Sequence, residues 1–250
     1  MNEMKRLLSF VRRAVDDYNM IEDGDKIAVG VSGGKDSLTL LEVLAEMRRF
    51  YPPKYEVYAV TVDMGFDGAD FSEIEEFCRR INVEYKVVKT EIAKIIFDIR
   101  KESNPCSLCS KMRRGSLHAA AQELGCNKVA LGHHYDDAVE TFMMNMFFEG
   151  RLGCFSPVTY LSNRQITLIR PMIYAQEKDV MYFTRKRTLP IIISPCPEDH
   201  ATEREKMKNL LLELEKNNKG LRHRIFTAMC RGEIDGFKKI GKYPDAGPIE

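Results

Sequence analysis

The residues best suited to chemistry stand in one short, glycine-containing string that separates a predicted strand from a predicted helix. Its six residues are Ser32-Gly33-Gly34-Lys35-Asp36-Ser37. Two adjacent glycines let backbone amides approach an anion closely, and the positive end of the helix dipole adds to the attraction. The string matches neither Gly-x-x-x-x-Gly-Lys-Ser/Thr nor Gly-x-Gly-x-x-Gly, so it indicates neither a P-loop kinase nor a classical dinucleotide enzyme. The sequence therefore predicts a phosphate cradle of another type.

Seven cysteines form the second group of reactive side chains, at positions 78, 106, 109, 126, 154, 196 and 230. An odd number in a chain without a secretory signal does not favour a disulfide framework. Cys106 and Cys109 are the one close pair, and with Cys196 they could hold zinc or an iron–sulfur cluster, because thiolates bind soft metals. A closed four-cysteine zinc site would need a second Cys-x-x-Cys, which the chain lacks; His200 is a candidate fourth ligand. We expect the other four cysteines to be small core residues.

A third group is acidic and follows a predicted strand at residues 128–131. It comprises Gly132-His133-His134-Tyr135-Asp136-Asp137. Carboxylates at a strand end can bind Mg²⁺ or take a proton from a substrate. Ordinary hydrogen bonding explains the two histidines as well as a functional role does. Arg170, which precedes Pro171, is equally consistent with a phosphate contact and with a structural role.

Strands and helices alternate along most of the chain, and this pattern would bring the three groups together. The apolar patterning predicts strands at 26–31, 55–63, 84–89, 128–131 and 166–169, and a loop over 150–167. It predicts helices at 4–19, 38–48, 70–81, 91–100, 107–124, 136–148, 176–187, 203–217 and 221–231. This order is typical of an α/β fold with a doubly wound parallel sheet, extended by a helical C-terminal part. Ligands in such folds bind beyond the carboxyl ends of the strands.

Composition narrows the class of protein further. The 250 residues are 44% hydrophobic and 30% charged, which excludes a disordered or fibrous chain. No apolar run approaches the roughly 20 residues of a membrane span, and the charged start is unlike a signal peptide, so we expect a cytoplasmic protein without a membrane partner. The net charge is +1, yet residues 204–242 hold 11 basic and 5 acidic residues. Candidate contacts to RNA phosphates there are Lys206, Lys208, Lys216, Lys219, Arg222, Arg224, Lys238 and Lys239.

The glycine-containing string resembles the signature Ser-Gly-Gly-x-Asp-Ser of PP-loop ATP pyrophosphatases. The resemblance implies a Rossmann-like, HUP-type sheet and a loop that holds the β- and γ-phosphates of ATP while the α-phosphorus is attacked. It also implies that Asp36 assists Mg²⁺ or the loop geometry and that Val62 and Asp63 lie near the adenine. The ATP-binding residues implied in all are Ser32, Gly33, Gly34, Asp36, Ser37, Val62, Asp63 and Gly132.

Further motifs are similar to those of the tRNA 2-thiocytidine synthetases (TtcA) of the TilS/TtcA group. They are Pro105-Cys106-Ser-Leu-Cys109-Ser-Lys-Met-Arg113-Arg114-Gly115, Ala130-Leu-Gly-His133-His134-Tyr-Asp136-Asp137-Ala-Val-Glu140-Thr141, Arg170-Pro171 and Pro190-Ile-Ile-Ile-Ser-Pro-Cys196. The resemblance implies ATP-dependent thiolation of a tRNA cytidine, C32, in the anticodon loop, and a homodimer. It implies a [4Fe-4S] cluster on Cys106, Cys109 and Cys196, and a sulfur donor that is a cysteine desulfurase or sulfide. Asp137 would be catalytic, with Asp136 the second candidate and Arg113 near the phosphates.

Three domains and several rival functions follow from this reading. Residues 1–24 are predicted as an N-terminal helix, 25–190 as the PP-loop ATP-pyrophosphatase domain and 191–250 as a basic helical C-terminal region. Thiolation of a uridine or another base, lysidine formation and a non-catalytic ATP-binding sensor are the alternatives. A lysidine synthetase has no use for the three cysteines, and the two-thiouridine enzymes carry cysteine pairs at both ends. AMP and pyrophosphate release in the presence of tRNA would exclude a sensor.

Overall fold

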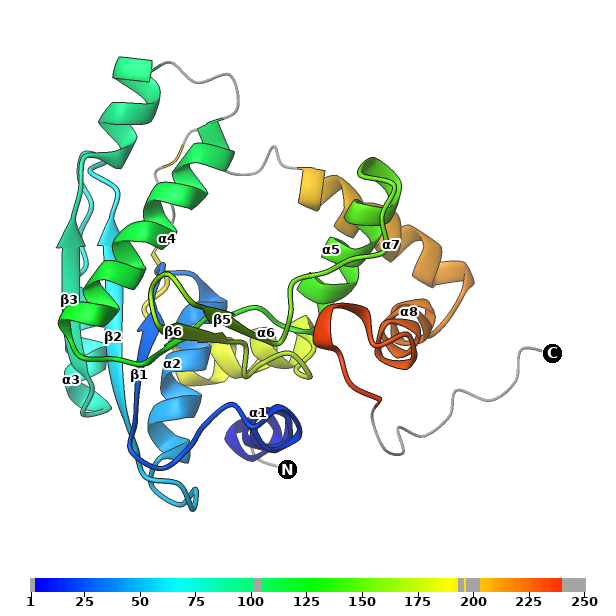
Figure 1. Cartoon of the computed structure of the whole chain (residues 1–250), viewed down its shortest axis with the longest axis horizontal. Helices are drawn as coiled ribbons and strands as arrows, with labels where there is room; N and C mark the ends of the chain where they lie inside the picture. Colours follow the sequence, from blue (N-terminus) through cyan, green and yellow to red (C-terminus); the bar gives the residue numbers. More distant parts are fainter. Residues whose placement is uncertain (1–2, 101–104, 193–195, 197–202, 240–250) are drawn as a thin grey trace.

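A six-stranded sheet forms the centre of the computed structural model, which describes residues 3–100, 105–192, 196 and 203–239 (Figure 1). The strand order is β3-β2-β1-β4-β6-β5. Five strands run parallel, and β5 is antiparallel to β6. The strands are β1 (Asp25–Gly30), β2 (Tyr55–Asp63), β3 (Glu84–Lys89), β4 (Lys128–Ala130), β5 (Val158–Leu161) and β6 (Ile166–Ile169). The predicted α/β class is confirmed.

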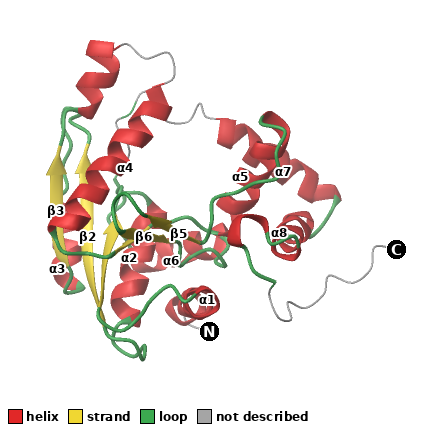
Figure 2. Ribbon diagram, in the orientation of Figure 1, coloured by secondary structure: helices red, strands yellow, loops and turns green. Residues whose placement is uncertain are grey.

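Helices cover both faces of this sheet and continue beyond it (Figure 2). In chain order they are α1 (Glu3–Tyr18), α2 (Lys35–Met47), α3 (Ser72–Arg80), η1 (Lys94–Arg100), α4 (Pro105–Glu123), α5 (Tyr135–Phe148), α6 (Glu177–Arg187), α7 (Glu203–Asn217), α8 (Leu221–Arg231) and η2 (Ile234–Gly236). In the described ranges, none combines the length and the apolar composition that a bilayer crossing needs.

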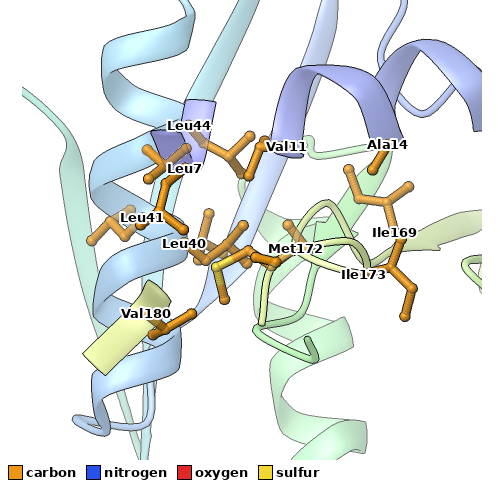
Figure 3. Close-up of a cluster of buried hydrophobic side chains, with 14 of the residues drawn as sticks. Leu7, Val11, Ala14, Leu40, Leu41, Leu44, Ile169, Met172, Ile173 and Val180 are labelled. Atoms are coloured by element: carbon orange, nitrogen blue, oxygen red, sulfur yellow. The ribbon is translucent and has the colours of Figure 1, made fainter. Parts of the chain in front are cut away.

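Burial on both faces explains the uninterrupted apolar runs of the central strands. Ile27, Ala28 and Val29 of β1 are all fully buried, as a parallel sheet between helices requires. Helices α1, α2 and α6 pack together on one face, where Leu7, Leu40 and Met172 belong to one buried cluster (Figure 3). Helix α4 packs against β1, β2, β3 and β4 and closes a second, smaller cluster.

The order of the strands changes direction at β1. This strand pairs with β2 on one side and with β4 on the other, because the chain runs outward from β1 to β3 and then returns to place β4 on the opposite side. In open parallel sheets, ligands bind at such a reversal, outside the carboxyl ends of the strands. The loops that follow β1 and β4 meet at this place, and they carry two of the three groups of reactive residues.

The C-terminal helices pack against α5 and share its core. Phe226 of α8 stacks on Tyr135 at the start of α5, with ring centroids 4.3 Å apart. Met207 and Leu211 of α7 are buried in the cluster that also contains residues of α1 and the sheet. The division into 1–24, 25–190 and 191–250 stays a prediction.

Two segments differ from the sequence-based expectation. The predicted loop over 150–167 contains β5, whose register pairs Val158 with Ile169 and Leu161 with Ile166. Its sequence Val-Thr-Tyr-Leu and the following Ser162-Asn163 turn did carry a strand and hairpin signal, which the surrounding glycines and Pro157 obscured. The predicted helix at 91–100 is a π-helix over Lys94–Arg100, a form that the period of 3.6 residues does not reveal.

Candidate active site

The loop after β1 is held in shape by its own hydroxyl groups. Ser37 Oγ accepts a hydrogen bond from the Ser32 amide at 3.1 Å and donates one to the Gly34 carbonyl at 2.9 Å. Gly33 has a φ of +83°, a conformation that disfavours side chains. Gly34 caps α2, and among the described residues no side chain occupies this cap. The amides at the start of α2 are therefore available to an anion.

Two glycines let neighbouring backbone segments approach this loop. A Cβ atom on Gly132 would lie 3.0 Å from the Asp36 carbonyl carbon and 3.1 Å from the Ser37 amide nitrogen. A Cβ atom on Gly33 would lie 3.0 Å from Cβ of Ile192, whose amide donates to the Gly33 carbonyl at 3.0 Å. The loop after β4 and the segment after α6 thus pack directly against the loop after β1.

The first turn of α5 carries a capping box built from His134 and Asp137. The His134 amide donates to Asp137 Oδ2 at 2.8 Å, and His134 Nδ1 accepts from the Asp137 amide at 3.4 Å. On its other side, His134 Nε2 lies 3.7 Å from Asp36 Oδ1. This Asp36 oxygen is buried and has no hydrogen-bond partner among the described residues, as expected of a group that receives a ligand or Mg²⁺.

Asp136 and Asp137 have different surroundings. Asp136 is 5% exposed, and its two oxygens accept from the Glu177 amide at 2.7 Å and from Arg222 at 2.9 Å. The Asp137 side chain is 21% exposed, and Arg204 lies 3.3 Å from Oδ1. Asp136 therefore ties α6 and α8 to α5, whereas Asp137 keeps access to solvent. Catalytic roles for either stay predictions, and the geometry favours Asp137.

Four charged residues near the site escaped the sequence-based search. Glu140 is buried one turn beyond Asp137, and burial, followed by the charge of Asp137, raises its pKa from 4.5 to about 7. Arg204 of α7 lies 3.5 Å from Glu140 and donates to Thr141 at 2.9 Å. Lys208 and Lys35 of the loop both pair with Glu177. Helix charge patterns gave the signal for Arg204 and Lys208 but suggested an outward-facing RNA surface.

His133 and Arg170 support the loop that follows α5. The His133 ring lies 4.8 Å from the ring of Phe155, and the Arg170 guanidinium lies over the same ring at 4.8 Å. Arg170 also donates to the Ser156 carbonyl. Burial lowers the pKa of His133 to about 4, so the imidazole is neutral at physiological pH. These contacts give Arg170 a structural role beside β6.

Val62 and Asp63 end β2, the neighbour of β1, on the edge that carries the loop. Asp63 Oδ1 accepts from the Gly65 amide at 2.9 Å, and the Asp63 carbonyl accepts from the Thr90 hydroxyl at 2.7 Å. Val62 is half-buried against the cluster under α4. Their position suits a nucleotide that lies across the strand ends, and contact with adenine stays a prediction.

Cys106, Cys109 and Cys196 come from two separate parts of the chain. The first two lie in the first turn of α4, and Cys196 stands four residues beyond Ile192. Burial raises the pKa of Cys109, Arg113 opposes this, and the charges of Cys196 and Cys106 raise it further. Cys109 is therefore close enough to Cys106, Cys196 and Arg113 to interact electrostatically with each of them. His200 lies outside the described residues.

The spacing of these three thiols bears on which metal group they could hold. Within the described ranges, no three ligating side chains stand close enough together to hold a single metal ion. A [4Fe-4S] cluster is wider than one zinc ion with its bonds of about 2.3 Å, and it takes thiolates, so three neighbouring cysteines that form no disulfide suit it. The remaining cysteines differ, since burial raises the pKa of Cys78, Cys154 and Cys230 to about 12 and that of Cys126 to about 11.

Comparison with known proteins shows the family to which this sequence and fold are similar. The PP-loop domain family matches residues 5–233. A tRNA-cytidine(32) 2-sulfurtransferase of Geobacter sulfurreducens is 42% identical over 228 residues, which cover 90% of this chain and 89% of the relative. One of Pseudomonas putida is 39% identical over 227 residues, 90% and 83% of the two chains. The U34-tRNA thiolase NcsA of Methanococcus maripaludis, solved with its [4Fe-4S] cluster, has a TM-score of 0.74 and 27% identity over 91% of this chain and 79% of its own.

Proposed function

The chain belongs to the PP-loop family of tRNA 2-thiocytidine synthetases, and from this membership we propose that it replaces O2 of cytidine 32 in tRNA by sulfur in an ATP-dependent reaction. It is a sulfurtransferase of an ATP-using family. The observation that carries the proposal is the meeting of the loop, Asp137 and Ile192, four residues before Cys196, at the carboxyl ends of β1 and β4. A phosphate cradle, a carboxylate and cysteine thiols are the parts that adenylation followed by sulfur transfer requires.

Adenylation is the first proposed step. The amides of the loop at residues 32–37 and of the first turn of α2 bind the β- and γ-phosphates, while Asp36 with its unpartnered oxygen binds Mg²⁺. The cytosine O2 then attacks the α-phosphorus and pyrophosphate leaves. The ring gains positive charge as this bond forms, and the carboxylate of Asp137 stabilises that charge. Arg113 is positioned beside the thiols to offset negative charge on the transferred phosphate.

Sulfur transfer is the second step. Cys106, Cys109 and Cys196 would hold a [4Fe-4S] cluster, which when bound supplies the sulfide that attacks C2 and expels AMP with the former O2. Cys78 and Cys230 are unsuited to this chemistry, because both are buried within the hydrophobic core. Inorganic sulfide or a cysteine desulfurase is the proposed donor.

The proposed partners and location extend this reaction. tRNA is the substrate, and exposed basic residues such as Lys216 and Lys219 support contacts to its phosphates. A homodimer is supported by Phe147, Phe148 and Leu152, which are 51%, 59% and 67% exposed near the end of α5. Light scattering on the purified protein tests this association. We place the protein in the cytoplasm, where its tRNA substrate occurs.

The decisive experiment is reaction of the anaerobically reconstituted protein with ATP, Mg²⁺, sulfide and unmodified tRNA. We expect AMP and pyrophosphate to appear together with 2-thiocytidine, measured by mass spectrometry of the tRNA nucleosides. Uridine thiolation is the second candidate, because the similar thiolase NcsA acts on U34. A product of 2-thiouridine would favour that candidate, and release of ADP in place of AMP would contradict both.

A further inference from the structure

Two lysine ammonium groups pair with one carboxylate oxygen beside the loop after β1. Glu177 is the first residue of α6, and its Oε1 lies 3.2 Å from Nζ of Lys35 and 2.9 Å from Nζ of Lys208. Lys35 comes from the loop after β1 and Lys208 from α7, a helix that packs against α5 (Figure 1). Two ammonium groups therefore share one oxygen, and each lysine weakens the attraction between Glu177 and the other lysine.

Glu177 is itself fixed in place. Its amide donates to Asp136 Oδ2 at 2.7 Å, and Asp136 is held in turn by Arg222 at 2.9 Å. The Glu177 side chain is 16% exposed. Burial alone would raise its pKa, but the hydrogen bond from Lys208 and the charge of Lys35 outweigh burial and lower the pKa below its usual value. The carboxylate is thus ionised at neutral pH.

Lys35 has a second acidic partner on the loop. Its Nζ lies 2.9 Å from Asp36 Oδ2, and the other oxygen of Asp36 is the buried one without a partner. Glu177 and Asp36 together fix the ammonium at the first turn of α2, next to the amides that face an incoming anion. A triphosphate entering there competes with Glu177 for Lys35.

We propose that Glu177 is a positioning residue for Lys35 and that Lys208 of α7 sets how firmly Glu177 holds this lysine. The inference rests on the proposed binding of ATP at residues 32–37. When the phosphates draw Lys35 away, Lys208 remains to neutralise Glu177. The C-terminal helix α7 thereby contributes to ATP affinity without touching the nucleotide.

The charges fix the sign of each expected effect. Glu177→Gln removes a negative charge close to the phosphates, so it should tighten binding of a non-hydrolysable ATP analogue roughly three- to ten-fold. It also frees Lys35 from its fixed position, so kcat for pyrophosphate release should fall. Lys208→Met leaves Glu177 to Lys35 alone and should weaken analogue binding by a similar factor. The double variant should bind the analogue nearly as the unmodified protein does and keep the low kcat.

Calorimetry of analogue binding to the full chain, with Mg²⁺ and without RNA, tests this inference. Lys206→Met is the matched control, because Lys206 lies on the same helix, is 71% exposed and pairs only with Glu203 at 2.7 Å among its described contacts. Opposite changes in affinity for Glu177→Gln and Lys208→Met, with unaltered binding in the control, support the inference. Weaker binding in both variants with a lowered Tm, or equal behaviour of Lys208→Met and the control, would overturn it. A failure of the unmodified protein to bind the analogue would instead refute the proposed function.

Discussion

The strand-end loops and the three proposed cluster cysteines are brought together by different kinds of contact. The loops after β1 and β4 meet in a close backbone contact at Gly132, and the capping box on α5 holds His134 beside Asp36. Cys106 and Cys109 lie at the start of α4 and Cys196 lies on the segment after α6, and Cys109 interacts electrostatically with the other two. The proposed nucleotide site is thus built from loops at the strand ends, whereas the proposed cluster ligands lie on α4 and on the segment after α6. This difference predicts that the two chemical steps can be separated by mutation.

Replacing a cysteine of the set is the strongest way to sharpen the comparison. Cys106→Ser should reduce formation of thiolated nucleoside by roughly 100-fold or more, because one of three proposed thiolate ligands is lost. Affinity for an ATP analogue should stay within about two-fold, since Cys106 is exposed and belongs to α4, not to the loops after β1 and β4. Cys126→Ala, in the buried group, is the control and should retain thiolation. Loss of nucleotide binding in Cys106→Ser would mean that the cysteines also contribute to nucleotide binding, so that the two regions are not independent.

The adjacent aspartates offer the next largest effect. Asp137→Asn should slow AMP formation about 100-fold, because the carboxylate charge at the site is removed. Asp136→Asn should instead lower the free energy of unfolding by roughly 3 kcal/mol, because Arg222 loses its buried partner. Single-turnover kinetics and urea unfolding measure the two quantities. The reverse assignment of effects would make Asp136 the catalytic residue.

Sequence reasoning located the strand-end region well because its signals are local. Adjacent glycines, a strand and a following helix specify the loop at residues 32–37 without any distant contact. It did not find Glu177 and it assigned Lys208 to an RNA surface, since a glutamate at a helix start and a lysine on a basic helix are ordinary surface residues until tertiary packing joins them. The edge strand β5 was missed for a similar reason, because its four residues gain their pairing from β6.

The free energy of unfolding should depend on pH through Glu140, which belongs to the strand-end region. Glu140 has a pKa raised from 4.5 to about 7, so between these values the folded state binds more protons than the unfolded state. Its contribution to stability is therefore present below pH 4.5 and is lost as the pH rises through 7. Glu140→Gln should raise the free energy of unfolding by roughly 2 kcal/mol at pH 8 and change it little at pH 4.5. Denaturant titrations at both pH values measure this, and an equal gain at both would exclude Glu140 as the source.

The smallest expected effect concerns the glycine that brings the strand-end loops together. Gly132→Ala should weaken binding of an ATP analogue about ten-fold, because the new methyl group would press on the backbone of Asp36 and Ser37. Gly115→Ala is the matched control, since no atom lies within 4 Å of its would-be Cβ. The control should stabilise α4 by roughly 0.5–1 kcal/mol and leave nucleotide binding alone. Equal binding in both variants would show that the close approach at Gly132 is dispensable.

The buried pair of Asp136 and Arg222 also limits how this fold can be recombined. Arg222 belongs to α8, more than 80 residues beyond the carboxylate that it neutralises. A chimera that exchanges the C-terminal helices for those of another RNA-modifying enzyme would leave Asp136 charged, buried and unpaired unless the donor supplies an equivalent arginine. New RNA specificities on this scaffold are therefore expected to arise by substitution on the outer face of α7 and α8, with the inner face retained.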